Sequence, residues 1–287
     1  MHEAVSLSLI SLSFDDALDQ HLDHALPVME KHGLVGTFYT HLAAPAFGRR
    51  TDEWRDAARR GHELGNHTIF HPADARKPWV REGNAIDRYS VDRMRMELET
   101  ANQLLRAIDG QTERTFAYPC SNPIVGRRGV AKSLLFKWGF EFTRLPGLVD
   151  RLHLDFGSTQ TSYVPVVGDL FVAGRGGGLT PDSPVPPLET FNKACLPSVA
   201  VDGWTLDGLA GFVRRAIAAE TWAILQFHGV GGGHRLDCNM AVFHDFIAWL
   251  ADHCADRVVT VVDGARRVWK LERPTPVSSP RKDESYA

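Results

Sequence analysis

The 287-residue sequence has few features of an exported, disulfide-bonded or membrane-spanning protein. Its four cysteines, Cys120, Cys195, Cys238 and Cys254, match no zinc or redox motif in their spacing. No apolar run approaches the roughly 20 residues that cross a bilayer, and no basic stretch followed by an apolar segment opens the chain. We therefore expect reduced cysteines, no membrane insertion and a cytoplasmic location, although the natural gene could add an export signal.

The chain also lacks a strong charge of either sign. Its formal net charge of −3 gives no electrostatic basis for binding nucleic acid or an anionic membrane. The hydrophobic fraction of 44% is ordinary for a soluble globular protein and allows a large core without disulfide bonds. A length of 287 residues suits a single barrel of parallel strands and helices.

Strand and helix signals alternate along most of the chain. Strands are expected at 5–14, 35–39, 63–67, 115–118, 222–228 and 258–262, and helices at 18–32, 53–60, 90–108, 205–220 and 239–253. Ser90, Thr205 and Asn239 stand where helix N-caps are expected. This βα alternation predicts an α/β fold with a parallel sheet or a barrel.

The alternation breaks down at residues 155–200. Gly174–Gly178 and Pro181–Pro187 predict an irregular insertion there, of a kind that often borders a functional groove. The polar, Pro- and Ser-rich residues 271–287 predict a weakly packed tail. We therefore predict a single domain over residues 1–270, followed by this tail.

Two adjacent carboxylates, Asp15 and Asp16, end the first apolar strand. Active sites of parallel barrels form in the loops that follow the strands, which favours a catalytic role for this pair. The alternative is an ordinary helix N-terminus, where acidic residues are also favourable.

The segment His67-Thr-Ile-Phe-His71 holds two histidines four residues apart. On a helix this spacing would put both imidazoles on one face, within reach of one ion. The alternative is a pair of ordinary surface histidines. His62-Glu63 does not begin a zincin motif, because Asn66 stands where the second histidine of that motif is needed.

His228 ends the expected strand 222–228 and precedes the glycine-rich segment Gly229–Gly233. A histidine at a strand end is well placed for acid–base chemistry. The glycine segment lacks the residues of a P-loop or a dinucleotide fingerprint, so a flexible turn is the alternative interpretation. Phe116–Cys120 ends another short strand and indicates little by itself.

Together these residues suggest a metal site. Asp16, His67 and His71 would supply the three protein ligands of a catalytic zinc ion, with a position left open for water. Asp15 would remain beside the ion as a general base. Such a donor set also accepts other divalent transition metals, such as cobalt, nickel or iron.

These residues resemble the motifs of the polysaccharide deacetylase family, also called carbohydrate esterase family 4 or the NodB homology domain. The resemblance extends over about residues 5–267. The resemblance rests on five segments that occur in the family's order. Ser13–Ala17 corresponds to the motif T-F-D-D-G, His67–Pro72 to H-S/T-x-x-H-P, and Phe116–Cys120 to F-R-P-P-Y. Asp202–Trp204 corresponds to an Asp near a Trp, and Leu225–His228 to L-x-H. The third and fourth correspond loosely, and the last has one extra residue.

The resemblance implies a distorted (β/α)7 barrel and hydrolytic removal of acetyl groups, usually from N-acetylated sugars. It implies that Asp15 is the base and His228 the acid that protonates the leaving group. The implied metal ligands are Asp16, His67 and His71, and the residues implied near the oxyanion or substrate are Cys120, Tyr118, Asp202 and Trp204. If Asp202 reaches His228, it would orient the imidazole and raise its pKa.

The sequence departs from the family at several positions. Ala117 stands where the family has an arginine that pairs with the base carboxylate. This loss should raise the pKa of Asp15 unless another arginine, such as Arg144 or Arg114, fills the space. Cys120-Ser121 replaces the usual Tyr-Gly and Ala17 replaces a glycine, which indicates a divergent branch with a smaller or unusual substrate.

Other functions fit the same residues. An O-acetyl esterase or a small-amide hydrolase would use the same site. A carbohydrate-binding protein could keep the metal and lose turnover, although it would need neither Asp15 nor His228. The sequence assigns no role to His234, in the loop after His228.

Overall fold

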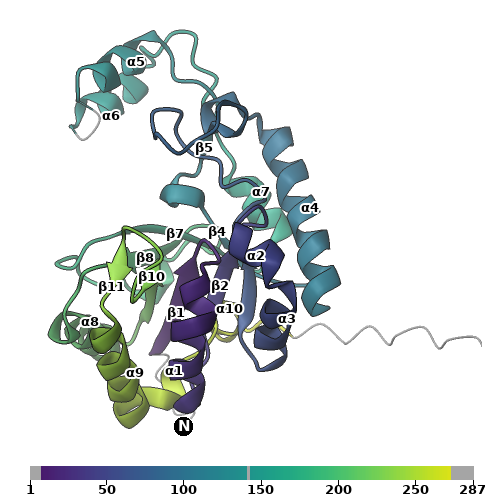
Figure 1. The fold of residues 1–287 in the computed structure, drawn as a ribbon. Helices are drawn as coiled ribbons and strands as arrows, with labels where there is room; N and C mark the ends of the chain where they lie inside the picture. Colours follow the sequence, from purple (N-terminus) through teal and green to yellow (C-terminus); the bar gives the residue numbers. More distant parts are fainter. Residues whose placement is uncertain (1–7, 141–142, 273–287) are drawn as a thin grey trace, which may run out of the picture.

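The computed structural model describes residues 8–140 and 143–272, and its centre is a closed barrel of parallel strands (Figure 1). The barrel strands are, in order, β1 (Leu9–Asp15), β2 (Thr37–Thr40), β3 (Glu63–Asn66), β4 (Phe116–Ala117), β7 (Gly174–Leu179), β8 (Leu196–Ala200) and β9 (Trp222–Phe227). The last strand, β9, closes the barrel by pairing with β1. This confirms the predicted (β/α)7 barrel.

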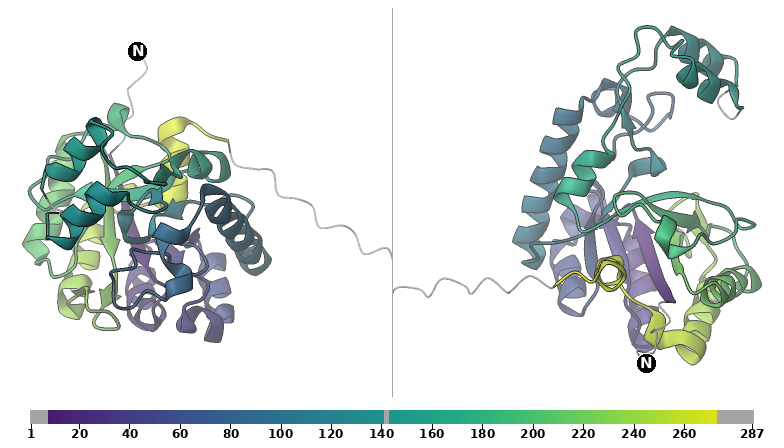
Figure 2. Two further views of the ribbon diagram at one scale, coloured as in Figure 1. Left: turned by 90° about the horizontal axis from the view of Figure 1, so that it is seen from above. Right: turned by 180° about the vertical axis from the view of Figure 1, so that it is seen from behind.

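Most helices cover the outside of this barrel (Figure 2). They are α1 (Leu26–Lys31), α2 (Pro45–Arg49), α3 (Thr51–Arg59), α4 (Val91–Asp109), α7 (Val164–Leu170), α8 (Leu206–Ala218), α9 (Met240–Cys254) and α10 (Val261–Trp269). Ser90, Thr205 and Asn239 cap α4, α8 and α9 through their side chains, as predicted. A π-helical turn (His21–Ala25) precedes α1, where one continuous helix was expected.

Two further helices, α5 (Val130–Lys137) and α6 (Leu145–Arg151), project away from the barrel. A two-stranded antiparallel sheet of β5 (Ile124–Val125) and β6 (Thr161–Ser162) lies at the base of this projection. Another small sheet, of β10 (Gly229–Val230) and β11 (Asp237–Cys238), follows β9. The expected strand residues 5–7 and tail residues 273–287 lie outside the described residues.

Side chains along β1 alternate between the outside and the inside of the barrel. Ile10, Leu12 and Phe14 belong to the apolar cluster formed with the surrounding helices. Phe14 stacks on Phe38 of β2, with ring centroids 4.8 Å apart. Because successive residues of a strand face opposite sides, Asp15 points into the barrel.

The predicted last strand, 258–262, is wrong. Val258 makes one isolated bridge to Ile10, and Thr260 then caps α10 by accepting a hydrogen bond from the Asp263 N–H. The buried carboxylate of Glu63 accepts a hydrogen bond from the Val262 N–H, which also lies in the first turn of α10. These acceptors satisfy N–H groups of the first helical turn and override the strand preference of a β-branched run.

The predicted irregular insertion at 155–200 is also wrong in part, because β7 and β8 are barrel strands within it. The glycines of β7 permit close contacts and do not mark a loop. A Cβ at Gly174 would lie 2.5 Å from the Ala194 carbonyl oxygen, and one at Gly177 would lie 2.4 Å from Ser121 Oγ. The segment that leaves the barrel lies earlier, between β4 and α7.

Gly65 on β3 shows how closely the barrel interior is packed. A Cβ there would lie 2.4 Å from the ring of Tyr39, a fully buried side chain. We expect Gly65→Ala to lower the free energy of unfolding by about 1–3 kcal/mol, because the ring must shift against its neighbours. Gly48→Ala is the control, since nothing lies within 4 Å of its Cβ. Equal urea midpoints for the two variants would contradict this account.

Candidate metal centre

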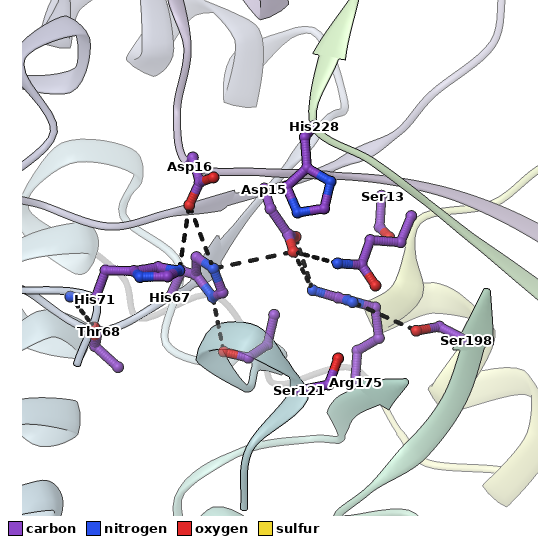
Figure 3. A network of polar contacts seen from close by, with 12 residues as sticks. Ser13, Asp15, Asp16, His67, Thr68, His71, Ser121, Arg175, Ser198 and His228 are labelled. Atoms are coloured by element: carbon purple, nitrogen blue, oxygen red, sulfur yellow. Dashed lines mark hydrogen bonds and ion pairs between the residues drawn. The ribbon is translucent and has the colours of Figure 1, made fainter. Parts of the chain in front are cut away.

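The ends of three barrel strands bring the predicted residues together (Figure 3). Asp15 is the last residue of β1 and Asp16 follows it, while His67 follows β3 and His228 follows β9. Parallel strands all end at the same mouth of a barrel, so residues far apart in the chain meet there.

Asp16, His67 and His71 form a group whose donor atoms all lie within 4.8 Å of one another. The Oδ1 atom of Asp16 is 3.4 Å from His71 Nε2 and 3.7 Å from His67 Nε2. A tetrahedral zinc ion with bonds of 2.0–2.1 Å separates its donors by roughly 3.3 Å. The three residues therefore fit a small divalent ion in both donor type and spacing.

The two histidines share a loop and not a helix face, which corrects the expectation from their spacing. Thr68 and His71 adopt left-handed backbone conformations, with φ of 68° and 50°. The side chain of Asn66 accepts a hydrogen bond from the Thr68 N–H, and Thr68 Oγ1 accepts one from the His71 N–H. These bonds hold the strained loop, so that both imidazoles turn toward Asp16.

Helix α4 supports the same loop through Glu97. Its buried carboxylate accepts hydrogen bonds of 3.0 Å from the N–H groups of Ile69 and Phe70 and one of 2.7 Å from the Tyr89 hydroxyl. Ile69 and Phe70 lie in the loop that carries the histidines, and Tyr89 lies just before α4. Glu97 thus positions the loop from His67 to His71, here called the metal loop. Nothing in the sequence pattern indicated this role.

The protonation state of His67 suits a ligand. Its Nδ1 lies 2.8 Å from the carbonyl oxygen of Ala117, so Nδ1–H donates and Nε2 remains free to face Asp16. Burial lowers the pKa of His67 to about 4, against the opposing effect of Asp15. The imidazole is therefore neutral at physiological pH, as metal binding requires.

Asp15 is held by Arg175, a residue that no sequence motif singled out. Nη2 of Arg175 lies 2.7 Å from both carboxylate oxygens, and Gln226 Nε2 donates a bond of 2.9 Å to one of them. Burial alone would raise the pKa of Asp15, but Arg175, with His67 and His228, lowers it below its usual range. The carboxylate therefore stays ionised.

Arg175 takes the place of the arginine that is missing at Ala117. The two residues are register partners on the adjacent strands β4 and β7, so their side chains leave the barrel wall on the same side. Neither predicted substitute fills this space: Arg114 is bound to Asp109, and Arg144 begins α6 in the projection. The available signal was a lone arginine within Gly174–Leu179, a segment whose glycine content had predicted a loop and not a strand.

Asp202 does reach His228, so the condition stated for its effect on the imidazole is met. His228 Nδ1 lies 3.0 Å from Asp202 Oδ2, and the His228 N–H donates to Asp202 Oδ1. Burial acts to lower the pKa of His228, but the hydrogen bond to Asp202 and the charge of Asp15 raise it above its usual value. The ring of His234 stacks on it, with centroids 5.2 Å apart.

The remaining predicted residues are Cys120, Tyr118 and Trp204. Cys120 is exposed and adopts a left-handed conformation in the turn after β4. Tyr118 is a core residue, because its ring is buried and its hydroxyl donates to the Ala194 carbonyl, so side-chain contact with substrate is not supported. The ring of Trp204 contacts Phe212 of α8 and packs against the apolar core. The described contacts therefore place Trp204 at the core and not beside Asp16, His67 and His71.

The Asp15–Arg175 pair predicts a pH-dependent loss of stability in Arg175→Met. The pKa of Asp15 is depressed in the folded protein, so its ionisation stabilises the fold above about pH 4. Without the cation, burial would raise that pKa, and the unpaired charge would cost about 3–5 kcal/mol at neutral pH. As the pH falls and Asp15 takes up a proton, the deficit should shrink.

Urea unfolding at about pH 7.5 and about pH 5 measures this effect. The double variant Asp15→Asn/Arg175→Met is the control, because it has no carboxylate to leave unpaired. We expect it to recover much of the lost stability at the higher pH. A deficit in Arg175→Met that is the same at both pH values would contradict the assigned pairing.

Comparison with known proteins agrees with this architecture. Residues 3–137 match the sequence profile of the polysaccharide deacetylase family. No curated protein matches the chain in sequence. Among solved structures, a protein from Mycobacterium smegmatis assigned to the polysaccharide deacetylases is similar, with a TM-score of 0.56 and 13% identity over 93% of this chain and 94% of that chain.

A carbohydrate esterase family 4 pseudoenzyme from Bacillus anthracis is also similar, with a TM-score of 0.51 and 15% identity over 90% of this chain. The match covers 65% of that protein, so this chain spans about two thirds of its length. At these identities the structural likeness concerns the fold alone. The chain is therefore similar to the polysaccharide deacetylase family in the sequence of residues 3–137 and in the fold of its seven-stranded parallel barrel.

Proposed function

We propose that the chain is a metal-dependent hydrolase that removes acetyl from an N-acetylated sugar or a related amide. One observation carries the proposal: an ionised carboxylate, Asp15, and a histidine of raised pKa, His228, stand on adjacent strands beside a His2Asp donor set. The family implies an acetylated carbohydrate as substrate, which agrees with this chemistry.

Each residue has a defined task in this proposal. Asp16, His67 and His71 would hold zinc or another divalent transition metal, which when bound would polarise the acetyl carbonyl and lower the pKa of a water molecule. Asp15 accepts the proton that this water loses as it attacks the carbonyl carbon. Arg175 and Gln226 hold both oxygens of Asp15 in place, and so orient it for this transfer.

The main-chain N–H of Cys120 is proposed to donate to the developing oxyanion. The other N–H groups of this turn are already bonded, that of Ser121 to the Tyr118 carbonyl and that of Asn122 to the Pro119 carbonyl. An N–H group in a rigid turn, aimed at the site where charge develops, stabilises the tetrahedral state at no reorganisation cost.

His228 favours an amide over an ester as the scissile bond. An amine leaves poorly unless its nitrogen is protonated, whereas an alkoxide or a phenolate leaves more easily. The hydrogen bond that His228 Nδ1–H donates to Asp202 keeps the imidazole oriented and favours the protonated form that can donate. His234, stacked on this ring, limits where the leaving group can lie.

A metal-containing binding protein is the alternative from a different class. One of the similar structures is described as a pseudoenzyme, and a mutant of that protein is described as having restored activity. In this chain the ionised base and the oriented histidine are both in place, and carbohydrate binding would require neither. We therefore favour an active enzyme.

The first test is acetate release from N-acetylated mono- and oligosaccharides and from small acetamides. We expect release by the purified protein, loss of at least about 100-fold after treatment with a chelator, and recovery on adding zinc or cobalt. Asp15→Asn is the matched control, because it leaves the three donors in place. Stoichiometric metal without release from any substrate would favour the binding protein, and a protein that binds no transition metal would overturn the proposed site.

The second test separates amide from ester hydrolysis. We expect His228→Gln to lower kcat/KM for an N-acetyl substrate by about 10²–10⁴-fold and to affect an aryl acetate far less, because only the amine needs a proton. Asp202→Asn should lower the pKa of His228 and move the alkaline limb of the pH–rate profile to lower pH. Equal losses on both substrates would argue against His228 as the acid.

A further inference from the structure

The projecting segment between β4 and α7 exposes a large apolar surface that the proposed chemistry does not use. Residues 127–140 and 143–156, here called the hairpin, include α5 and α6 and stand clear of the barrel in Figures 1 and 2. Neither helix contains a buried residue. A groove of about 440 Å³ between them is lined entirely by apolar side chains, including Leu134, Trp138 and Leu148.

Exposed apolar side chains are concentrated on this hairpin. Of the 15 large hydrophobic residues that are exposed in the described parts of the chain, nine lie in it: Val130, Leu134, Trp138, Phe140, Leu145, Leu148, Leu152, Leu154 and Phe156. Trp138 and Phe156 are 73% and 71% exposed. Contiguous apolar patches of this kind mark interaction surfaces, because leaving them in water is unfavourable.

The hairpin is also basic, although the whole chain is not. Residues 127–156 contain six lysines and arginines and three acidic residues, whereas the complete chain has a net charge of −3. Lys137, Arg144 and Arg151 are exposed next to the apolar side chains. A second copy of the chain would present the same positive charge, so self-association through this face is disfavoured, whereas an anionic surface is attracted.

A clamp holds the hairpin beside the metal loop. The ring of Phe136 in α5 lies between two guanidinium groups, with Arg76 4.7 Å and Arg128 4.3 Å from its centroid. Both arginines bond to Asp74, which follows the metal ligand His71 by three residues. The apolar face is therefore presented on the side of the barrel where the metal residues lie.

We propose that the hairpin docks the protein peripherally on a lipid bilayer that contains anionic phospholipids. Leucine and aromatic side chains beside lysine and arginine are the composition of helices that lie in the membrane interface. Their apolar side chains enter the boundary between head groups and acyl chains, and the cations face the anionic head groups. Among the described residues, none of the helices combines the length and apolar character needed to span a bilayer.

The test is cosedimentation of the full chain with vesicles, either of phosphatidylcholine alone or of phosphatidylcholine mixed with phosphatidylglycerol. We expect binding to the mixed vesicles that weakens with salt and is at least about tenfold weaker on phosphatidylcholine alone. Trp138→Ser/Phe156→Ser should weaken binding by about tenfold or more. The matched control is Met96→Ser/Leu104→Ser, which removes exposed apolar residues of α4.

Charge reversal gives a second, independent variant. Lys137→Glu should reduce binding to the mixed vesicles, whereas Arg59→Glu, on an exposed position of α3, should not. Circular dichroism and metal content establish that each variant is folded. Cosedimentation with vesicles does not depend on deacetylase activity, so this test is separate from that of the proposed function. Absence of binding to either vesicle, equal losses in hairpin and control variants, or a dimer that dissociates in Trp138→Ser/Phe156→Ser would each overturn the proposal.

Discussion

The pairing of Asp15 with Arg175 inside the barrel is the interaction on which the candidate site depends. Both side chains are almost completely buried, so each charge would be costly without the other. The guanidinium contacts both carboxylate oxygens and so fixes the orientation of Asp15 as well as its charge. Asp16, the next residue, then turns out of the strand with φ of 79° and meets the histidines of the β3 loop.

The place of this arginine also explains how the chain departs from the family that it resembles. The resemblance implies an arginine at position 117 on β4, and the structure has Ala117 there with Arg175 as its register partner on β7. A cation can therefore reach the same carboxylate from either of two adjacent strands, provided that the other position is small. The glycines beside Arg175 belong to this arrangement, because close neighbours leave no room for their side chains.

Polar groups other than the candidate metal ligands support the loop that carries His67 and His71, and the ring of His228 beside it. Glu97 of α4 and the Ala117 carbonyl of β4 hold the loop and the His67 tautomer, and Asp202 holds His228. The geometry of the candidate site at the barrel mouth thus depends on a second set of polar groups that the helices and strands bring into position. The apolar, basic hairpin is attached to this same loop through Asp74, which links the proposed membrane surface to the proposed active site.

The sequence by itself determined the barrel and the order of the site residues. Alternating strand and helix patterns, together with Asp15, Asp16, His67, His71 and His228 at the ends of three expected strands, predicted one mouth carrying a His2Asp donor set, because parallel strands must end on the same side. Only the tertiary structure decided which arginine pairs with Asp15, that Val261 begins a helix, that Tyr118 is buried, and that Trp204 packs against the core. Those outcomes depend on contacts between distant segments, which local patterns do not contain.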